Sequence, residues 1–278
     1  MLQHHADCIE RLRHHFDDDL EVLAVILGGS VAKGTEKPTS DIDGVVVVTP
    51  ERRERLRQTH QLAGVITGVC DYEGAMFDLK YVTVDWLRAA AERGSEPTRS
   101  SFLHARVLAV YDRGHPDARE PELASAAVLQ GVLDRIGRYP VEEKAERLHS
   151  FYAAYYLNKG YFWHESFKRP NPFLLARTAS EIALYGLRMI LAQNEVLFPC
   201  MKWLTRAVES CVDRPENVVA LAETFVSSPT EETLAPFAAA VERYAPEGFT
   251  VWDPRLGGRY VEDFEQWWYS PRPYVAEW

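Results

Sequence analysis

Two short apolar runs, joined by a glycine-rich polar loop, constrain the fold of this chain more than any other feature. Val22 to Leu27 is a run of six apolar residues, and Val45 to Val48 is a run of four valines. Short runs rich in β-branched residues and bounded by Gly, Ser, Asp or Pro are typical of buried strands. The chain is therefore expected to form two buried strands with a polar loop between them.

The segment between these runs carries polar groups suited to chemistry. Asp41 and Asp43 flank Ile42, so strand alternation turns both carboxylates to one face and Ile42 into the core. Two adjacent carboxylates repel each other unless a cation or a proton intervenes, and such hard oxygen ligands suit Mg²⁺. Gly29 and Ser30, at the end of the first run, offer backbone N–H groups and a hydroxyl to an anion. The sequence predicts a phosphate-binding loop beside a metal site.

The order of these groups resembles the signature of the polymerase β-like nucleotidyltransferase superfamily: an apolar strand, Gly-Gly-Ser, a spacer, then Asp-Ile-Asp leading into a valine strand. The resemblance covers residues 1–114. It implies a third carboxylate on a later strand, and Asp78 in the apolar stretch 76–84 is well placed for it. Asp71 and Glu73 are rival candidates, although their turn position favours a structural role. The alternative is an ordinary α/β domain with a glycine turn and an aspartate turn, which the flanking strands and the third aspartate disfavour.

The apolar pattern changes from mixed to purely helical near Gly114. Before that point strands are expected at 65–70, 76–84 and 106–111, and helices at 2–16, 50–62 and 86–93. Thr49 and Asp85 are expected to cap the helices that follow them. After it, helices are expected at 121–139, 141–168, 173–193, 201–212, 215–225, 231–244 and 260–268.

This change predicts two domains. Residues 1–114 are expected to form an α/β (α+β) nucleotidyltransferase domain with a short mixed sheet, and residues 115–278 an all-α helical-bundle domain that binds the substrate. The second part resembles, more loosely, bacterial two-domain enzymes such as the aminoglycoside adenylyltransferases. The active site is expected in the cleft between the two domains.

Composition narrows the class of protein. The chain has 278 residues, is 46% hydrophobic and carries a formal net charge of −10. An acidic chain disfavours long nucleic acid as a partner, because such binding relies on Lys and Arg neutralising phosphates. Cys8, Cys70, Cys200 and Cys211 form no C-x-x-C pair and no zinc spacing, so reduced thiols are expected. With no secretory signal and no long apolar run, a cytoplasmic protein without a membrane segment is expected.

Other conspicuous residues are expected to have structural roles. His4 and His15 share a helix face, but eleven residues at ~1.5 Å rise separate them by about 16 Å, too far for one ion. The histidines of this helix are therefore expected on a solvated face. Lys33 is expected to be exposed. Lys202 is a candidate for neutralising a phosphate, and an exposed lysine beside Trp203 is the equal alternative.

An aromatic stripe follows the long helix expected at 141–168. Its members lie at helical spacing: Tyr152, Tyr155, Tyr156, Lys159 and Trp163. Amphipathic helices bury such stripes routinely, so a core role is favoured. The alternative is stacking on a base or an acceptor, with Asn158 or Lys159 supplying polar contacts.

The resemblance implies transfer of a nucleoside monophosphate from a nucleoside triphosphate, ATP being the expected donor, to an acceptor hydroxyl with release of pyrophosphate. Asp41 and Asp43 would hold two Mg²⁺ ions. Asp78 would hold the ion next to the acceptor and take the hydroxyl proton. Gly29 and Ser30, with Lys202 as a weaker candidate, would contact the nucleotide.

Three classes of function fit. The first is a small-molecule nucleotidyltransferase, such as an enzyme that modifies an aminoglycoside-like antibiotic. The second is nucleotidylation of a partner protein or RNA, as in some toxin–antitoxin systems. The third is a non-catalytic nucleotide-binding protein. The intact carboxylates disfavour the third, and the helical domain favours the first. The acceptor, the preferred base and the oligomeric state stay open.

Overall fold

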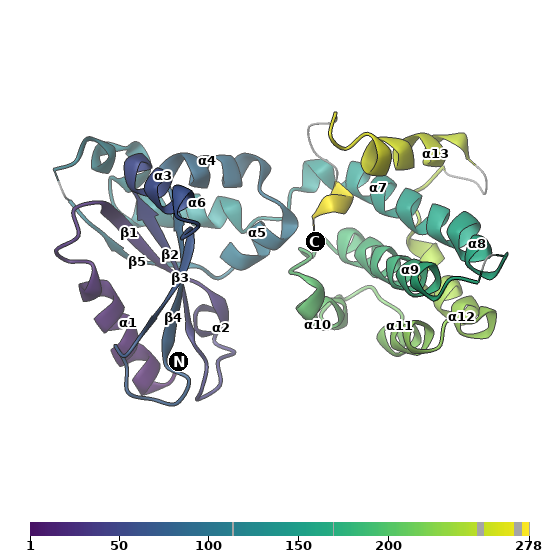
Figure 1. Ribbon diagram of the computed structural model, residues 1–278, viewed down its shortest axis with the longest axis horizontal. Helices are drawn as coiled ribbons and strands as arrows, with labels where there is room; N and C mark the ends of the chain where they lie inside the picture. The colour runs from purple at the N-terminus through teal and green to yellow at the C-terminus, as the bar shows by residue number, and fades with distance from the viewer. Residues whose placement is uncertain (113, 169, 249–252, 270–273, 278) are drawn as a thin grey trace. The chain divides into compact units, whose positions relative to one another are not determined.

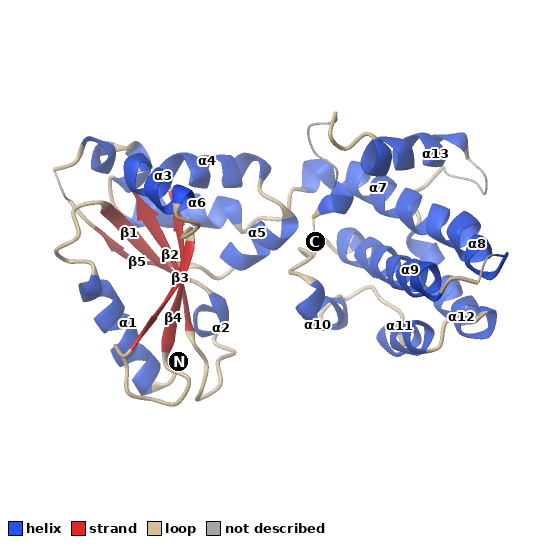
Figure 2. Ribbon diagram, in the orientation of Figure 1, coloured by secondary structure: helices blue, strands red, loops and turns tan. Residues whose placement is uncertain are grey.

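The two apolar runs form neighbouring strands in a mixed sheet (Figures 1 and 2). Strands β1 (Val22–Leu27) and β2 (Ile42–Val48) are antiparallel, with Val25 opposite Val46. The sheet has the order β3-β4-β2-β1-β5, in which β3 is Ala63–Thr67, β4 is Met76–Val82 and β5 is Arg106–Val110. β2 pairs with β4 in parallel, whereas the β1–β2, β1–β5 and β3–β4 pairs are antiparallel. The short mixed sheet expected from the sequence is confirmed.

Helices cover both faces of this sheet. The computed structural model describes residues 1–112, 114–168, 170–248, 253–269 and 274–277. Helix α1 (Gln3–His15) packs on one face, and helices α4 (Val84–Arg93) and α6 (Ala126–Ile136) pack on the other (Figure 1). Because both faces are covered, all six residues of β1 are buried. The remaining α-helices of this part are α2 (Gly29–Lys33), α3 (Pro50–Gln58) and α5 (Glu96–Phe102).

Of the two helix caps predicted from the sequence, one is confirmed and the other is wrong. The Thr49 side chain accepts a hydrogen bond from the Arg52 N–H and caps α3, as expected. Asp85 does not cap α4. The helix begins earlier, and the hydroxyl of Thr83 accepts from the Trp86 N–H instead. Because β4 ends at Val82, Thr83 is the residue with extended backbone at the junction, and a cap requires that conformation.

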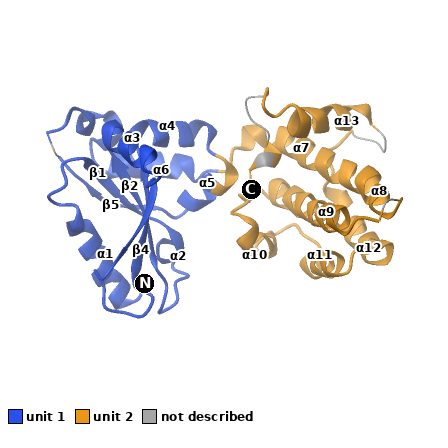
Figure 3. Cartoon of the chain, in the orientation of Figure 1, with its two compact units in different colours: residues 1–94, 98–138 blue, residues 95–97, 139–278 orange. Residues whose placement is uncertain are grey.

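The chain divides into two compact units (Figure 3). Unit 1 is residues 1–94 with 98–138, and unit 2 is residues 95–97 with 139–278. The division lies after Arg138, whereas the sequence pattern suggested a boundary at Gly114. The reason is α6, which packs on α4 and β5. Its Gln130 amide donates to the Ala105 carbonyl (3.0 Å) and accepts from the Val107 N–H (3.1 Å), which binds the helix to the end of the sheet.

Unit 2 contains helices and, among its described residues, no strand, as expected. Its α-helices after α5 are α7 (Lys144–Leu157), α8 (Trp163–Lys168), α9 (Pro172–Gln193), α10 (Leu204–Glu209), α11 (Val218–Ser227), α12 (Glu231–Val241) and α13 (Pro254–Tyr260). A π-helical turn at Asn158–Phe162 separates α7 from α8, where one helix was expected. Within this unit the fully buried Arg147 pairs with Glu96 (2.8 Å) and Glu277 (2.7 Å).

Two cysteines differ from expectation. A disulfide joins Cys8 of α1 to Cys70 in the loop after β3, while Cys200 and Cys211 are free. The expectation of reduced thiols is therefore wrong for this pair. The two residues are 62 positions apart in sequence, and only the packing of α1 against the sheet brings their Cα atoms to 5.8 Å.

Among the described residues, no helix has both the length and the apolar character to cross a membrane.

Candidate active site

Three aspartates converge where β2 and β4 lie side by side. Asp41 immediately precedes β2, Asp43 is its second residue, and Asp78 lies directly opposite Asp43 in the parallel pairing with β4. One carboxylate oxygen from each lies within 4.8 Å of the others. All three side chains are partly exposed, whereas Ile42 is fully buried. These three residues are called the acidic triad below.

The acidic triad is electrostatically unfavourable without a cation. Burial, followed by the charges of Asp41 and Asp78, raises the pKa of Asp43 above its ordinary value. Lys80 and Lys33 oppose this effect without cancelling it. A bound cation would offset the repulsion. The donor set consists of carboxylate oxygens only, which fits a hard ion such as Mg²⁺ better than a soft transition metal.

The glycine loop after β1 is fitted closely around Asp43. The Gly28 N–H donates to the Asp43 carbonyl (2.9 Å). Gly29 has a φ of +62°, and a Cβ added there would lie 1.7 Å from Asp43 Oδ2. Glycine is required at position 29 for both reasons, since any side chain would occupy the place of the carboxylate. Ser30, in the first turn of α2, is partly exposed beside this loop, and Lys33 in its last turn is exposed.

The backbone just before Asp41 is held by two residues for which the sequence predicted no role in the site. His5 Nε2 lies 3.2 Å from the Ser40 carbonyl oxygen, and the Tyr72 hydroxyl donates to the same oxygen (2.8 Å). His5 is fully buried, so the expectation of a solvated histidine face is wrong for this residue. Burial and the charge of Asp41 raise the pKa of Tyr72. No local pattern could reveal these contacts, because His5 and Tyr72 lie 35 and 32 residues from Ser40 in the sequence.

The rival carboxylates lie elsewhere. Asp71 accepts an ion pair from Arg11 (3.2 Å), and its side chain is 85% exposed. Glu73 is also exposed. Neither belongs to the group of described residues that can share an ion with Asp41 and Asp43. The geometry therefore favours Asp78 as the third member.

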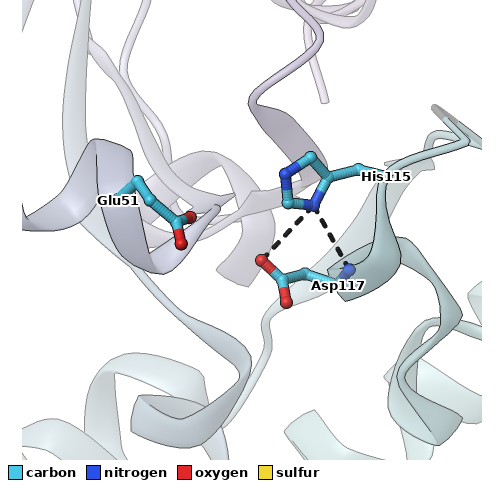
Figure 4. Close-up of side chains that lie close together, drawn as sticks. All are labelled: Glu51, His115 and Asp117. Carbon is cyan, nitrogen blue, oxygen red and sulfur yellow. Dashed lines mark hydrogen bonds and ion pairs between the residues drawn. The ribbon is translucent and has the colours of Figure 1, made fainter.

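A second group of possible ligands lies in unit 1, away from the acidic triad. Glu51 in the first turn of α3 approaches His115 and Asp117, which come from a short 3₁₀ segment (Figure 4). His115 Nδ1 accepts from the Asp117 N–H (3.2 Å) and so caps that segment. We assign no metal here, because Nδ1 of His115 already has this structural role and Glu51 is exposed.

Two other candidates lie in unit 2. Lys202 is exposed, with Nζ 5.2 Å from the Trp203 ring centroid, and its contact with a phosphate stays a prediction. In the aromatic stripe, Tyr155 and Trp163 are each 1% exposed, so a core role is confirmed for them. Lys159 forms an ion pair with Glu242.

Comparison with known proteins gives one family. Residues 9–82 match the family model described as a nucleotidyltransferase domain. The matched segment includes the glycine loop and the whole acidic triad. No curated protein matches the chain.

Proposed function

We propose that this protein modifies a small molecule. The premise is that residues 9–82 form a nucleotidyltransferase domain of the polymerase β-like superfamily and that the chain is a nucleotidyltransferase. It would move a nucleoside monophosphate from a nucleoside triphosphate, with ATP the expected donor, to an acceptor hydroxyl and release pyrophosphate. The observation that carries this proposal is the convergence of the acidic triad beside the glycine loop.

The acidic triad supplies the metal ligands in this proposal. Asp41 and Asp43 would hold two Mg²⁺ ions, and Asp78 would hold the one on the acceptor side. Such ions would supply charge stabilisation for the attacking and leaving oxygens of an in-line displacement. The mutual repulsion of the three carboxylates supports this assignment, since bound cations relieve such repulsion.

The glycine loop would orient the triphosphate. Gly29 presents backbone without a side chain. It begins α2, and the first N–H groups of a helix have no acceptor inside the helix, so they can bind an anion. The Ser30 hydroxyl would donate to a β- or γ-phosphate oxygen. Lys202, whose side chain is exposed, stays the weaker candidate for a contact with the nucleotide.

Asp78 would also accept the proton of the acceptor hydroxyl. A carboxylate oxygen must lie within hydrogen-bond reach of that hydroxyl when the acceptor is bound. The pairing of Asp78 with Asp43 across β2 and β4 supports this role, because it fixes the Asp78 backbone directly beside the metal ligands.

An aminoglycoside-like antibiotic is the acceptor we favour. The net charge of −10 suits a polycationic acceptor, and a separate helical unit follows the nucleotidyltransferase domain. Nucleotidylation of a partner protein or RNA is the alternative. Action in the cytoplasm fits either acceptor.

The test is a transfer assay with each α-labelled triphosphate, Mg²⁺, and a panel of aminoglycosides, lincosamides, proteins and tRNA. The proposal expects label on a small molecule and pyrophosphate release, with Asp41→Asn inactive. The matched control is Asp18→Asn, an exposed aspartate remote from the site, which should keep full activity. Label on tRNA or protein alone would favour the alternative acceptor class. Full activity of Asp41→Asn would refute the metal assignment.

A further inference from the structure

Two side chains from distant parts of unit 1 lie within hydrogen-bond distance of the Ser40 carbonyl oxygen. His5 comes from the first turn of α1, and Tyr72 from the loop between β3 and β4. Both place a donor atom on the Ser40 oxygen, at 3.2 Å and 2.8 Å. A carbonyl oxygen has two lone pairs, so these two contacts use its full capacity.

This carbonyl belongs to the peptide bond that leads into Asp41. The peptide unit is planar, so fixing its oxygen also fixes the plane that contains the Asp41 N–H and Cα. Asp41 precedes the first residue of β2 and is therefore outside the hydrogen-bonded ladder that holds Asp43. Its backbone needs another restraint, and the two contacts on Ser40 supply one.

The two donors are themselves held in place. His5 is fully buried, and its ring meets that of Tyr72 edge to face, with 5.0 Å between the centroids. The loop that carries Tyr72 is tied to α1 by the Cys8–Cys70 disulfide. Arg11 of α1 also donates to the Val69 carbonyl (2.6 Å). Helix α1 and this loop therefore act as one support.

The protonation state of His5 agrees with a donor role. Burial, followed by the neighbouring His4, lowers the pKa of His5, so the ring is neutral near pH 7. A neutral ring that donates through Nε2 leaves Nδ1 as an acceptor, and Nδ1 is buried without a hydrogen-bond partner. That arrangement costs free energy, which is consistent with a function for the Nε2 contact.

We propose that His5 and Tyr72 are positioning residues that hold Asp41 in its metal-binding orientation. The inference rests on the proposed function, because it assumes that Asp41 binds the metal. Neither side chain touches the nucleotide or the acceptor in this proposal. Their effect passes through the Ser40 carbonyl alone.

The test measures Mn²⁺ binding by electron paramagnetic resonance, in the full chain with a non-hydrolysable ATP analogue. Tyr72→Phe keeps the ring and removes the hydroxyl. We expect its affinity for Mn²⁺ to fall about five-fold, the change produced by losing one neutral hydrogen bond. The matched control is Tyr111→Phe, which removes a hydroxyl that donates to the Arg13 carbonyl elsewhere on α1 and should bind Mn²⁺ normally.

A second pair of variants separates positioning from packing. His5→Gln retains an amide N–H near the position of Nε2 and should restore most of the affinity, whereas His5→Leu should not. Steady-state rates should follow, with kcat reduced and the KM for the triphosphate nearly unchanged. A merely structural role would lower the melting temperature of both His5 variants without separating their Mn²⁺ affinities. If Tyr72→Phe does not fold, the comparison of the two His5 variants decides.

The failure of this inference and that of the proposed function have different signatures. In one outcome the wild type binds Mn²⁺, Asp43→Asn does not, and both Tyr72→Phe and His5→Leu bind it with normal affinity. That outcome would overturn the inference and leave the proposed function intact. Absence of Asp43-dependent Mn²⁺ binding in the wild type would overturn the proposed function, and the inference with it.

Discussion

Replacing Asp43 by Asn should stabilise the metal-free protein while removing its response to Mg²⁺. At the 4.8 Å limit that the acidic triad satisfies, two unit charges repel by about 1 kcal/mol in water and about 3.5 kcal/mol at an effective dielectric constant of 20. The three side chains are partly exposed, so the effective dielectric constant lies between these two values. Asp43 has two such neighbours, and the nearby Lys33 and Lys80 offset part of the repulsion. We expect a net gain of about 1–2 kcal/mol.

This gain is measurable as a change in melting temperature. For a protein of this size 1 kcal/mol shifts the midpoint by about 2–4 °C, so metal-free Asp43→Asn should melt about 2–8 °C above wild type at pH 7.5. Asp18→Asn is the control and should melt with wild type. Adding Mg²⁺ should raise the wild-type midpoint and leave that of Asp43→Asn unchanged, because only the former has the complete ligand set.

The pH dependence follows from the direction of the Asp43 pKa. The pKa is raised in the folded state, so the folded protein binds more protons than the unfolded chain between the ordinary value, about 4, and the folded one. Wild-type stability from this group therefore falls as the pH rises through that window. The advantage of Asp43→Asn should shrink as the pH is lowered toward 4. A variant that melts below wild type at pH 7.5, or one whose advantage grows on acidification, would show that carboxylate repulsion does not destabilise this site.

Three further predictions concern single residues of the site. Ser30→Ala should weaken ATP binding more than AMP binding in calorimetry, and equal losses would assign the hydroxyl another role. Asp78→Asn should keep Mg²⁺–ATP binding but lose most of its turnover, because a proton acceptor acts in the transition state; normal turnover there, with Asp71→Asn inactive, would identify the turn residue as the third carboxylate. Gly29→Ala should abolish metal-dependent turnover, since the new methyl group meets a triad carboxylate at 1.7 Å. Gly34→Ala is its control, because Gly34 also has a positive φ (+70°) but no atom within 4 Å of the added Cβ, and an equal loss of turnover there would assign the effect to backbone strain.

The parts of the site that depend on local pattern could be predicted from sequence. Strand alternation correctly buried Ile42 and turned Asp43 away from that core, because a period of two is a property of any strand. A glycine at position 29 is a local signal of a different kind, since a tight turn after a buried strand favours glycine, and the structure shows a positive φ there. The assignment of Asp78 relied on its position in a strand-like run and on the family resemblance. Its carboxylate lies within 4.8 Å of those of Asp41 and Asp43, and this geometry supports the assignment.

The parts that depend on pairing between distant segments could not be predicted. Nothing local indicates that β4 would lie parallel to β2 with Asp78 opposite Asp43. The burial of His5 has the same origin. A helix with histidines on several sides gives no preference for one buried ring until the 38–41 loop and Tyr72 pack against it. The Cys8–Cys70 disulfide follows from this packing as well.

The division of the chain shows how tertiary contacts override a change in pattern. The strands end at Val110, and the helical pattern that follows suggested a new domain. The first of those helices, α6, instead buries Leu129, Leu133 and Ile136 in the cluster that covers one face of the sheet. An amphipathic helix requires an apolar partner, and its sequence does not specify which one.

We propose that Asp41 and Asp43 hold the metal together with the nucleotide, and crystals grown with Mn²⁺ and a non-hydrolysable ATP analogue would show this without an activity assay. An anomalous difference map locates manganese independently of any assay. We expect a peak in direct contact with both carboxylates and with the phosphates of the analogue. Bound nucleotide without a peak at these two residues would contradict it, as would manganese found only beside Glu51, His115 and Asp117.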